Sequence, residues 1–266
     1  MPEGPSIVIL REQVSEFAGQ VIRRAEGNAK IDMHLLPGRR VLRLRSFGKQ
    51  FLVELSGQLA VRVHLLMFGS YRINEDRDIA PRLSLSFDRG ELNFYNCSVR
   101  LLPGDLETAY DWRGDVMSDH WDPKLARAKL RKMPHTLVCD ALLDQTIFAG
   151  VGNIIKNEVL FRIRVHPLST VGALSTYKLR QLVDQARVYA FEFLAWRKAH
   201  VLARNWLVHN RGRCPRHDIP LQRAHLGTRH RRSFFCLRCQ KLYAEDSLAQ
   251  CPGHPDVVIP RLRETP

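Results

Sequence analysis

The chain has 266 residues, enough for two domains of ordinary size and a small appended module, and 45% of them are hydrophobic, enough to form cores. Lys and Arg number 41 against 27 Asp and Glu, a formal net charge of +14, so the expected partner is a polyanion and above all nucleic acid. Nothing approaches the roughly 18 apolar residues of a membrane span, and charged residues from Arg11 onward interrupt the first apolar run, which argues against a secretory segment. We therefore expect a cytoplasmic protein that does not associate with membranes.

The first five residues, MPEGP, carry the first chemical signal. If Met1 is removed, Pro2 becomes an N-terminal secondary amine, and an α-amino group titrates below a lysine side chain, so more of it is an unprotonated nucleophile near neutral pH. Such an amine can attack a sugar aldehyde carbon and form a Schiff base, with Glu3 beside it as the proton carrier. Taken alone, a segment of this kind is more often a flexible terminus.

A helix and a series of short strands are predicted next. Residues 6–20 place apolar side chains at spacings of three to four, which predicts an amphipathic helix. The apolar face consists of Ile7, Leu10, Val14 and Phe17. From residue 21 to about 102, runs rich in β-branched and aromatic residues alternate with turns, which predicts an antiparallel sandwich or barrel of roughly a hundred residues. The runs are 39–47, 50–56, 58–68, 82–88 and 91–102.

The pattern becomes helical after residue 123. Residues 103–123 are acidic with proline and glycine at the edges, which indicates a linker, and the helical patterns beyond it predict an all-helical bundle. Those patterns are 124–133, 137–148, 154–163 and 175–203. The fold class is therefore α+β and multidomain. We expect a β-sandwich domain with a leading helix at 1–120, a helical domain at 121–210, a cysteine-bearing module at 211–245 and a tail of unknown role at 246–266.

A glycine-rich junction joins two of the helical patterns. Residues 145–153, QTIFAGVGN, end on Asn153, a residue type preferred at helix N-caps. Backbone N–H groups at a helix start favour anions, so a DNA phosphate is expected at Gly152 and Asn153. The simpler interpretation is an ordinary capped turn between helices, and the spacing alone favours it.

Four of the six cysteines fall in the last fifth of the chain, which in a reducing compartment favours metal over disulfides. Two pairs with two intervening residues lie 18 residues apart, a spacing typical of a zinc ribbon. The predicted ligands of one structural zinc ion are Cys214, His217, Cys236 and Cys239. A basic stretch at 226–233 around a predicted hairpin turn lies between the pairs and would present arginines to phosphate. A third pair, Cys251 and His254, leaves open a different ligand set or a second metal.

Two predicted turns in the strand-rich half carry residues that suit nucleic acid. Lys49 follows Gly48 between two runs, where it could reach a phosphate or a reacting sugar, although most lysines in turns are simply solvated. Leu66, Met67 and Phe68 end another run. Most such residues belong to a core, but at the tip of a turn they can wedge into a base stack.

Together these residues resemble the formamidopyrimidine-DNA glycosylase and endonuclease VIII family of bifunctional repair enzymes. The resemblance rests on the MPEGP terminus, the Gly48-Lys49 turn, the GVGN of residues 150–153 and the terminal Cys/His hairpin, and it extends over residues 2–239. Each signal is modest, but their occurrence together in this order is specific. The resemblance implies an N-terminal β-sandwich, a helix-two-turn-helix domain, a zinc-finger β-hairpin, and double-stranded DNA bound in the cleft between the first two.

The resemblance also implies the catalytic residues. Pro2 corresponds to the imine-forming nucleophile, Glu3 to the general acid/base, and Lys49 to a lysine that contacts DNA and assists catalysis. The implied activity is removal of a damaged base through a Pro2 Schiff base, followed by strand cleavage through β,δ-elimination. No organic cofactor is required, because the imine nitrogen accepts the electrons.

The implied DNA contacts come from three other segments. Asn153 corresponds to the phosphate-binding asparagine of the helix-two-turn-helix motif. Arg231 best matches the hairpin arginine that grips the phosphate beside the lesion, with Arg232 as the fallback. Met67 aligns with a residue that fills the void left by the everted base. Its neighbours in the same turn are Leu66 and Phe68.

The sequence departs from the family pattern at three places. His217 replaces the usual second cysteine of the zinc site, which keeps tetrahedral N/S ligation and changes its charge. Ser6 stands where the family has a second glutamate, so Glu3 is expected to have less local support. Val99 and Leu101 stand where the purine-lesion branch has an arginine and an aromatic wedge, which favours the endonuclease VIII branch and oxidised pyrimidines.

We therefore expect a monomeric, nucleoid-associated DNA glycosylase and AP lyase of base excision repair. The alternative is a non-catalytic zinc-containing DNA-binding protein or damage sensor, which needs the same charge and hairpin but no free Pro2. A third interpretation is an RNA-binding protein with a zinc ribbon.

Overall fold

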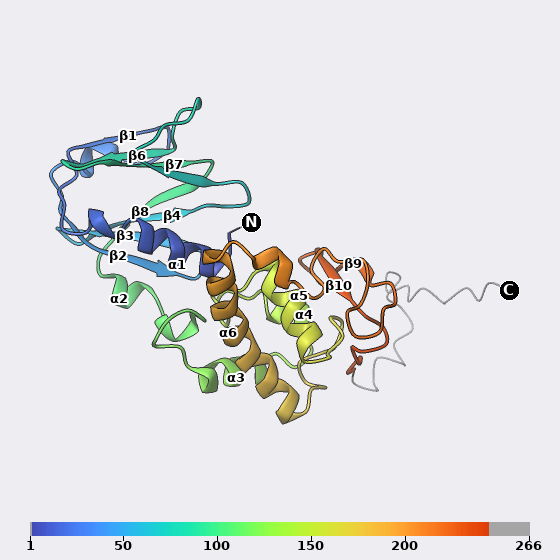
Figure 1. The fold of residues 1–266 in the computed structure, drawn as a ribbon. Coiled ribbons are helices and arrows are strands. Elements are labelled where there is room, and N and C mark those ends of the chain that lie inside the picture. The colour runs from blue at the N-terminus through green and yellow to red at the C-terminus, as the bar shows by residue number, and fades with distance from the viewer. Residues whose placement is uncertain (1, 245–266) are drawn as a thin grey trace.

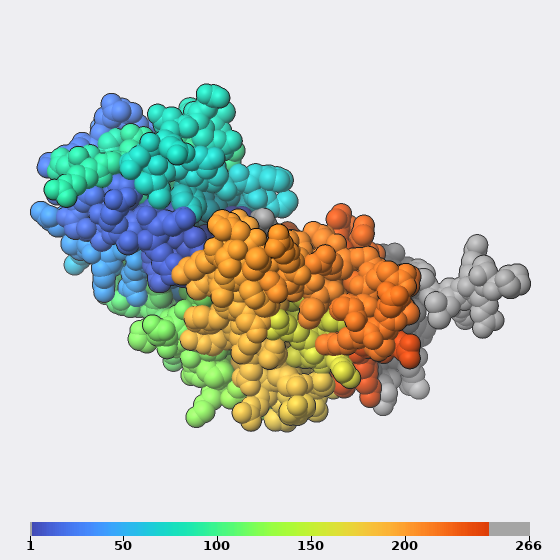
Figure 2. Space-filling model, in the orientation of Figure 1, coloured from blue at the N-terminus to red at the C-terminus, as the bar shows by residue number. Residues whose placement is uncertain are grey.

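Residues 2–244 are described by the computed structural model, in which an N-terminal lobe of one helix and two sheets meets a C-terminal lobe of helices and a small hairpin (Figures 1 and 2). The predicted tail at 246–266, with Cys251 and His254, lies outside these residues. No helix in the described part of the chain combines the length and apolar character that crossing a bilayer requires.

The leading helix α1 (Gly4–Gln13) confirms the helix predicted at 6–20, but with different ends. Its predicted apolar face is fully buried, including Val14 and the Phe17 of a following 3₁₀ turn (Ser15–Phe17). The chain leaves the helix early because Gly19 donates its N–H to the carbonyl of Val41 and so joins the sheet.

The strands form two antiparallel four-stranded sheets that pack face to face, so the alternative of a barrel is not realised. One sheet has the order β1-β6-β7-β5 and the other β2-β3-β4-β8. Phe51 of β3 and Phe94 of β7 are fully buried between the sheets, with ring centroids 5.9 Å apart. The strands are β1 (Arg24–Glu26), β2 (Val41–Phe47), β3 (Gln50–Leu55), β4 (Leu59–His64), β5 (Ser70–Ile73), β6 (Leu83–Ser86), β7 (Glu91–Tyr95) and β8 (Ser98–Pro103).

Two predicted runs are wrong in extent. The run 91–102 is two strands, because Asn96 adopts a left-handed conformation (φ +50°) and turns the chain. The run 58–68 ends as a strand at His64, and Leu66 is left-handed (φ +54°). The short strands β1 and β5 were not predicted, because they contain few β-branched residues and lie partly in solvent.

The helical lobe is built on the long helix α6, which packs against both α1 and α5 (Figure 1). The Ser175 side chain caps α6 by accepting from the N–H of Lys178, and the helix ends at Lys198 rather than near residue 203. The helices after the sandwich are α2 (Leu106–Ala109), α3 (Pro123–Arg131), α4 (Val138–Ala141), α5 (Asn153–Arg162) and α6 (Thr176–Lys198).

The helix predicted at 137–148 is wrong beyond its first turn, since only α4 is helical there. Asp144 accepts hydrogen bonds from the N–H and the hydroxyl of Thr146, and the Gln145 amide donates to the carbonyls of Leu143 and Val151. Side chains that form hydrogen bonds with backbone N–H and C=O groups in this way compete with the hydrogen bonds of a helix. The apolar residues of this segment are therefore buried in a loop rather than along one face of a helix.

The basic stretch at 226–233 forms the predicted hairpin, with β9 (Gln222–Leu226) paired to β10 (Arg231–Phe235). The hairpin lies beside α5 and contacts it through β10 (Figure 1). Its base continues into the two Cys/His pairs.

The two lobes meet where three glycines from distant segments touch. Gly4 donates its N–H to the carbonyl of Gly150 at 2.9 Å, and a Cβ atom on Gly4 would lie 2.9 Å from the Gly150 Cα. A Cβ atom on Gly48, in the β2–β3 turn, would lie 2.9 Å from the Gly150 nitrogen. Any side chain at these positions pushes backbone against backbone.

We expect Gly4→Ala to destabilise the protein by about 1–3 kcal/mol, because overpacking at a backbone contact outweighs the better helix propensity of alanine. Urea unfolding measures the free energy, and Gly212→Ala, with no atom within 4 Å of its added Cβ, is the control. A Gly4→Ala variant as stable as the parent would show that the backbones of Gly4 and Gly150 can move apart without loss of stability.

Candidate functional site

A cavity of about 470 Å³ opens at the junction of the two lobes. It is the meeting point of the N-terminus, the β2–β3 turn, the β4–β5 loop, the α4–α5 loop and the hairpin. Its lining residues are Pro2, Phe47, Gly48, Lys49, Gln50, His64, Leu66, Met67, Leu143, Gln145, Ala149, Asn153, Arg229 and Arg231.

Glu3 lies fully buried beside this cavity, with its carboxylate on the N-terminus of α5. Its Oε2 accepts hydrogen bonds from the N–H groups of Gly152 (3.1 Å) and Ile155 (3.3 Å), and its Oε1 accepts from Ile154 (2.8 Å). A Cβ atom at Gly152 would overlap the carboxyl group, so this position requires glycine. The helix start thus binds an anion supplied by the protein itself.

The environment of Glu3 and Lys49 shifts both groups toward neutrality. Burial raises the pKa of Glu3, and the charge of Lys49 and the three N–H groups oppose this rise. Burial lowers the pKa of Lys49, Glu3 opposes the change, and the charges of Arg231 and Arg229 add to it. Two neighbouring groups whose pKa values are shifted in opposite directions are suited to proton transfer.

Pro2 and Lys49 are both half-buried and line the cavity from opposite segments. Pro2 immediately precedes Glu3, so the hydrogen bonds of Glu3 also hold Pro2 at the cavity wall. Lys49 occupies the second position of a two-residue hairpin turn whose first residue, Gly48, is left-handed (φ +53°). The β2–β3 turn therefore directs Lys49 to the lobe junction.

Two expectations about the start of α5 require correction. Asn153 is the first residue of the helix, and its N-cap is Gly152. The Gly152 N–H donates to Glu3, so the phosphate expected on that N–H group is wrong: an internal carboxylate takes its place. The Asn153 side chain donates to the carbonyl of Arg232 at 3.0 Å, while its buried Oδ1 lacks a hydrogen-bond partner within residues 2–244.

The hairpin contributes the basic wall of the cavity. Arg231 and Arg229 line it, whereas Arg232 is exposed and does not. Successive residues of a strand point to opposite faces, so β10 cannot present Arg231 and Arg232 on the same side. Arg229 was not predicted, because nothing local separates it from the other arginines of the hairpin.

The β4–β5 loop forms the rim on the opposite side. Leu66 and Met67 are each 50% exposed and line the cavity, and Phe68 is 80% exposed outside it. Exposed apolar side chains at the mouth of a basic cavity suit contact with bases rather than a core.

Two further residues shape the site. His64 accepts from the Leu66 N–H at its Nδ1 (3.0 Å), and burial lowers its pKa. Asp115 accepts from the N–H groups of Gly48 and Met117, both at 2.9 Å, and burial raises its pKa to about 6. The sequence could have indicated a role for His64, because this residue directly precedes the apolar loop. It could not have indicated Asp115, because the contact of Asp115 with Gly48 joins residues far apart in the chain.

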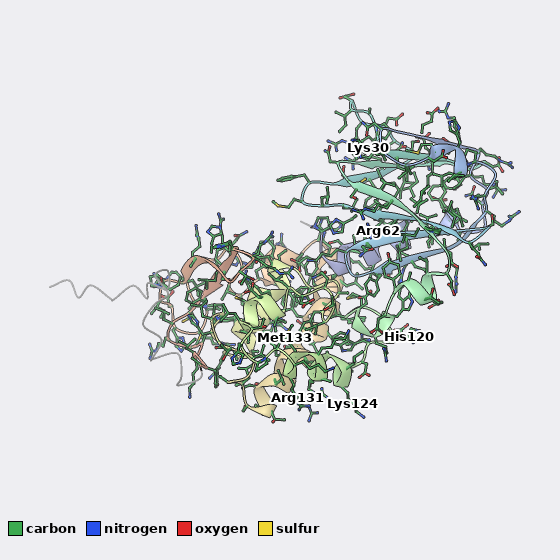
Figure 3. All side chains as sticks on the ribbon, turned by 180° about the vertical axis from the view of Figure 1, so that it is seen from behind. Lys30, Arg62, His120, Lys124, Arg131 and Met133 are labelled. Carbon is green, nitrogen blue, oxygen red and sulfur yellow. The ribbon has the colours of Figure 1, made fainter. Side chains whose placement is uncertain are left out.

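Basic charge by itself does not locate the site. Exposed Lys30 lies in the N-terminal lobe, and exposed Lys124 and Arg131 lie on α3 at the other end of the molecule (Figure 3). The cavity is distinguished by Lys49, Arg229 and Arg231 in its wall and by the buried carboxyl group of Glu3 beside it, a combination that attracts an anionic ligand and provides a proton carrier.

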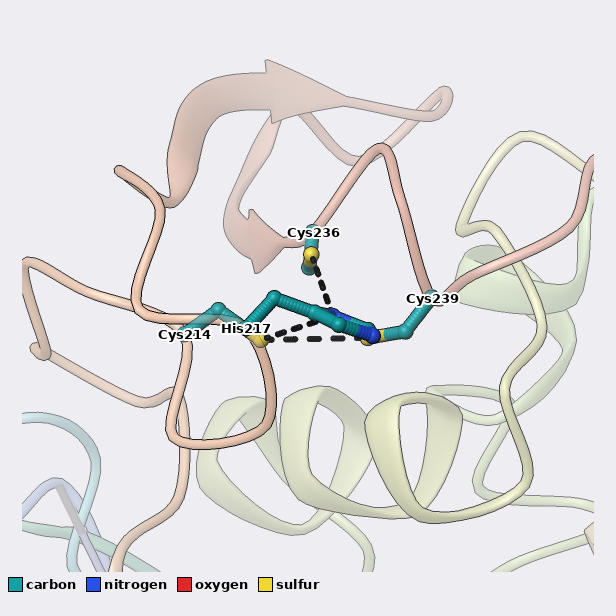
Figure 4. Close-up of side chains that lie close together, drawn as sticks. All are labelled: Cys214, His217, Cys236 and Cys239. Carbon is teal, nitrogen blue, oxygen red and sulfur yellow. Dashed lines mark hydrogen bonds between the residues drawn. The ribbon is translucent and has the colours of Figure 1, made fainter.

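The four predicted metal ligands converge at the base of the hairpin (Figure 4). Their donor atoms all lie within 4.8 Å of one another. Cys214 Sγ is 3.7 Å from His217 Nδ1 and 3.9 Å from Cys239 Sγ, and Cys236 Sγ is 3.9 Å from His217 Nδ1. A tetrahedral zinc ion places its ligand atoms about 3.6–3.8 Å apart, so the set fits such an ion.

Comparisons with known proteins identify both lobes. Residues 1–100 match the model of the formamidopyrimidine-DNA glycosylase N-terminal domain, and residues 114–190 match that of the formamidopyrimidine-DNA glycosylase H2TH domain. A probable endonuclease 8 2 of Streptomyces coelicolor is 31% identical over 70% of this chain and 72% of its own length.

Longer relatives and solved structures show the same likeness. Endonuclease 8-like 3 of Xenopus laevis is 29% identical over 86% of this chain, and the match spans only 39% of that relative's length. In fold, the chain is similar to Lactococcus lactis formamidopyrimidine DNA glycosylase, solved with DNA containing an AP site, with a TM-score of 0.80 at 23% identity over 90% of this chain and 99% of that one.

The raised pKa of Glu3 predicts a pH dependence of stability. An acid whose pKa is higher in the folded state stabilises the fold fully below its unfolded pKa, near 4.5, and loses that contribution as the pH rises through its folded pKa. Glu3→Gln has no such titration. The free energy of unfolding of the variant minus that of the parent should therefore increase between about pH 4 and about pH 8 in urea titrations. A difference that stays constant or decreases would contradict the raised pKa.

Proposed function

Because the chain belongs to the formamidopyrimidine-DNA glycosylase and endonuclease VIII family, we propose that it is a bifunctional DNA glycosylase and AP lyase of base excision repair. The observation that carries the proposal is the convergence of Pro2, Glu3 and Lys49 on one basic cavity at the lobe junction. A non-catalytic DNA-binding protein has no need for a buried carboxylate beside Pro2.

The basic residues of the cavity are proposed to bind duplex DNA around a damaged nucleotide. Lys49, Arg229 and Arg231 surround the opening, and Asn153, the first residue of α5, lines its edge and is proposed to contact a phosphate there. A damaged base is poorly stacked and costs less to extrude, so it enters the cavity more readily than an intact base. Leu66 and Met67 at the rim would occupy the space that the base leaves.

The proposed chemistry begins with the Pro2 nitrogen, which is free once Met1 has been removed. It attacks C1′ of the deoxyribose, and the bond from C1′ to the base breaks with its electrons leaving on the base. The C1′–O4′ bond then breaks, with O4′ taking up a proton, and this ring opening leaves an iminium at C1′. The iminium makes the C2′ proton acidic, so removal of that proton expels the 3′ phosphate with the electrons of the C3′–O bond, and a second elimination expels the 5′ phosphate with those of the C5′–O bond. Glu3 is proposed to carry the protons, because it directly follows Pro2 in the chain and burial raises its pKa above the usual value of a glutamate.

Oxidised pyrimidines are the proposed lesions. The two positions at which the purine branch carries an arginine and an aromatic wedge are part of β8 here, where Val99 is buried and Leu101 is half-buried. The exposed Leu66, Met67 and Phe68 supply the apolar contact from a single loop instead. We further propose that the protein acts as a monomer, on DNA in the cytoplasm.

The cluster of Cys214, His217, Cys236 and Cys239 is proposed to bind one structural zinc ion. Its donor distances match tetrahedral ligation, and Cys214 and Cys236 are buried. Zinc bound there would cross-link residues 214–217 to residues 236–239 and so hold the base of the hairpin.

Borohydride trapping tests the catalytic proposal. The parent should form a covalent complex with duplexes that contain an abasic site or an oxidised pyrimidine, and Pro2→Gly should reduce trapping strongly, because the secondary amine is lost. Glu3→Gln should slow strand cleavage by about 10²–10⁴-fold. Intact mass checks the removal of Met1, and binding to a tetrahydrofuran-containing duplex checks that the variants remain folded. If Pro2→Gly traps and cleaves as well as the parent, the nucleophile is misassigned.

Metal analysis tests the zinc proposal. Cys214→Ser combined with His217→Ala should lower zinc from about one per chain to nearly none, because half of a tetrahedral ligand set is gone. Cys251→Ser combined with His254→Ala is the matched control and should keep its zinc. The reverse pattern would assign the metal to the third pair.

A further inference from the structure

Helix α5 carries four buried polar side chains, which is unusual for a short helix. The exposed fractions are 8% for Asn153, 0% for Lys156, 2% for Asn157 and 0% for Glu158. Buried polar and charged groups are costly unless they are hydrogen-bonded. Glu158 accepts from the N–H groups of residues 207–209, and the other three side chains face the hairpin strand β10.

The three side chains converge on the main chain of β10. The carbonyl of Arg232 accepts from Asn153 Nδ2 (3.0 Å), Lys156 Nζ (3.3 Å) and Asn157 Nδ2 (3.3 Å). Lys156 Nζ also donates to the hydroxyl of Ser233 at 2.8 Å. That hydroxyl in turn donates to the carbonyl of Arg231 at 3.4 Å. The ammonium of Lys156 is therefore connected to two consecutive main-chain carbonyls of β10, directly to that of Arg232 and through Ser233 to that of Arg231.

We propose that Lys156 is a positioning residue that, through Ser233 and the carbonyl of Arg232, directs Arg231 into the cavity. Ser233 and Arg231 lie on the same face of β10, because strand residues two apart point to the same side. Fixing Ser233 against α5 therefore fixes the face from which Arg231 extends. The proposal rests on the proposed function, in which Arg231 contacts the DNA phosphate.

The electrostatics agree with this geometry. Burial is the main reason that the pKa of Lys156 falls to about 8; Cys139 opposes the shift and the charge of Arg231 adds to it. The charge of Arg231 therefore lies close enough to Lys156 to affect its titration. A methionine of similar length would fill the same volume without the desolvation cost, so packing alone does not account for a lysine here.

The tip of the hairpin has its own support. Asp140, a buried residue of α4, accepts from the N–H groups of Thr228 (2.8 Å) and Arg229 (3.4 Å). The tip is thereby anchored independently, and the metal cluster lies at the base. Loss of Lys156 should leave both ends of the hairpin in place and release only the central segment around Arg231.

A double-mutant cycle between Lys156→Met and Arg231→Ala tests the proposal. The measured quantities are the Kd for a duplex with a tetrahydrofuran site and the single-turnover rate of abasic-site cleavage at saturating protein. We expect each single variant to raise Kd roughly tenfold, the scale of one charged hydrogen bond. The cleavage rate of bound DNA should change little for Lys156→Met. The double variant should bind no more weakly than Arg231→Ala alone.

Lys178→Met is the matched control, because Lys178 also donates to a backbone carbonyl, that of Ile163, but on α6 away from the hairpin. It should leave Kd unchanged. If Lys156→Met loses zinc or melts early, Ser233→Ala replaces it in the cycle with the same expected outcome. Losses that multiply in the double variant would overturn the positioning role while the proposed function stands. A parent that neither traps nor binds abasic DNA would overturn the proposed function, and this proposal with it.

Discussion

The carboxylate of Glu3 on the N-terminus of α5 is the interaction on which the rest of the structure depends. Three N–H groups hold it, and they belong to the C-terminal lobe while Glu3 belongs to the N-terminal one. This contact places Pro2 at the cavity and requires glycine at 152. The close approach of Gly4 to Gly150 lies at the same junction, so the contacts that join the lobes also build the site.

Helix α5 serves as a shared platform for three parts of the molecule. Its N-terminus binds Glu3, its polar face binds β10, and Glu158 binds the backbone of residues 207–209. Such a buried polar surface contributes less stability than an apolar one would, because every charge must be desolvated. Its hydrogen bonds are directional, so they fix the orientation of the N-terminus and of the hairpin on α5. Apolar packing alone would define these orientations less well.

Charge in the cavity is arranged so that each group alters its neighbours. Lys49, Arg229 and Arg231 together favour an anion; burial lowers the pKa of Lys49, and the charges of Arg231 and Arg229 lower it further. Glu3 is the buried acid in their midst, and its raised pKa is compatible with proton transfer. A polyanion entering the cavity would neutralise the same charges that depress Lys49, so binding and protonation are coupled.

Local patterns in the sequence were enough to predict the leading helix, the antiparallel strands, the hairpin and the convergence of two Cys/His pairs, because periodicity and short spacing are local properties of the chain. The prediction of a helix at 137–148 was wrong beyond its first turn, because hydrogen bonds of the Asp144 and Gln145 side chains stabilise a loop although the apolar spacing is helical. Only the tertiary structure decided that the start of α5 receives Glu3 instead of a phosphate. It also decided that Arg231 rather than Arg232 reaches the cavity, and that Lys156 is buried. These outcomes depend on segments up to about 150 residues apart meeting in space, and such contacts leave no local periodicity.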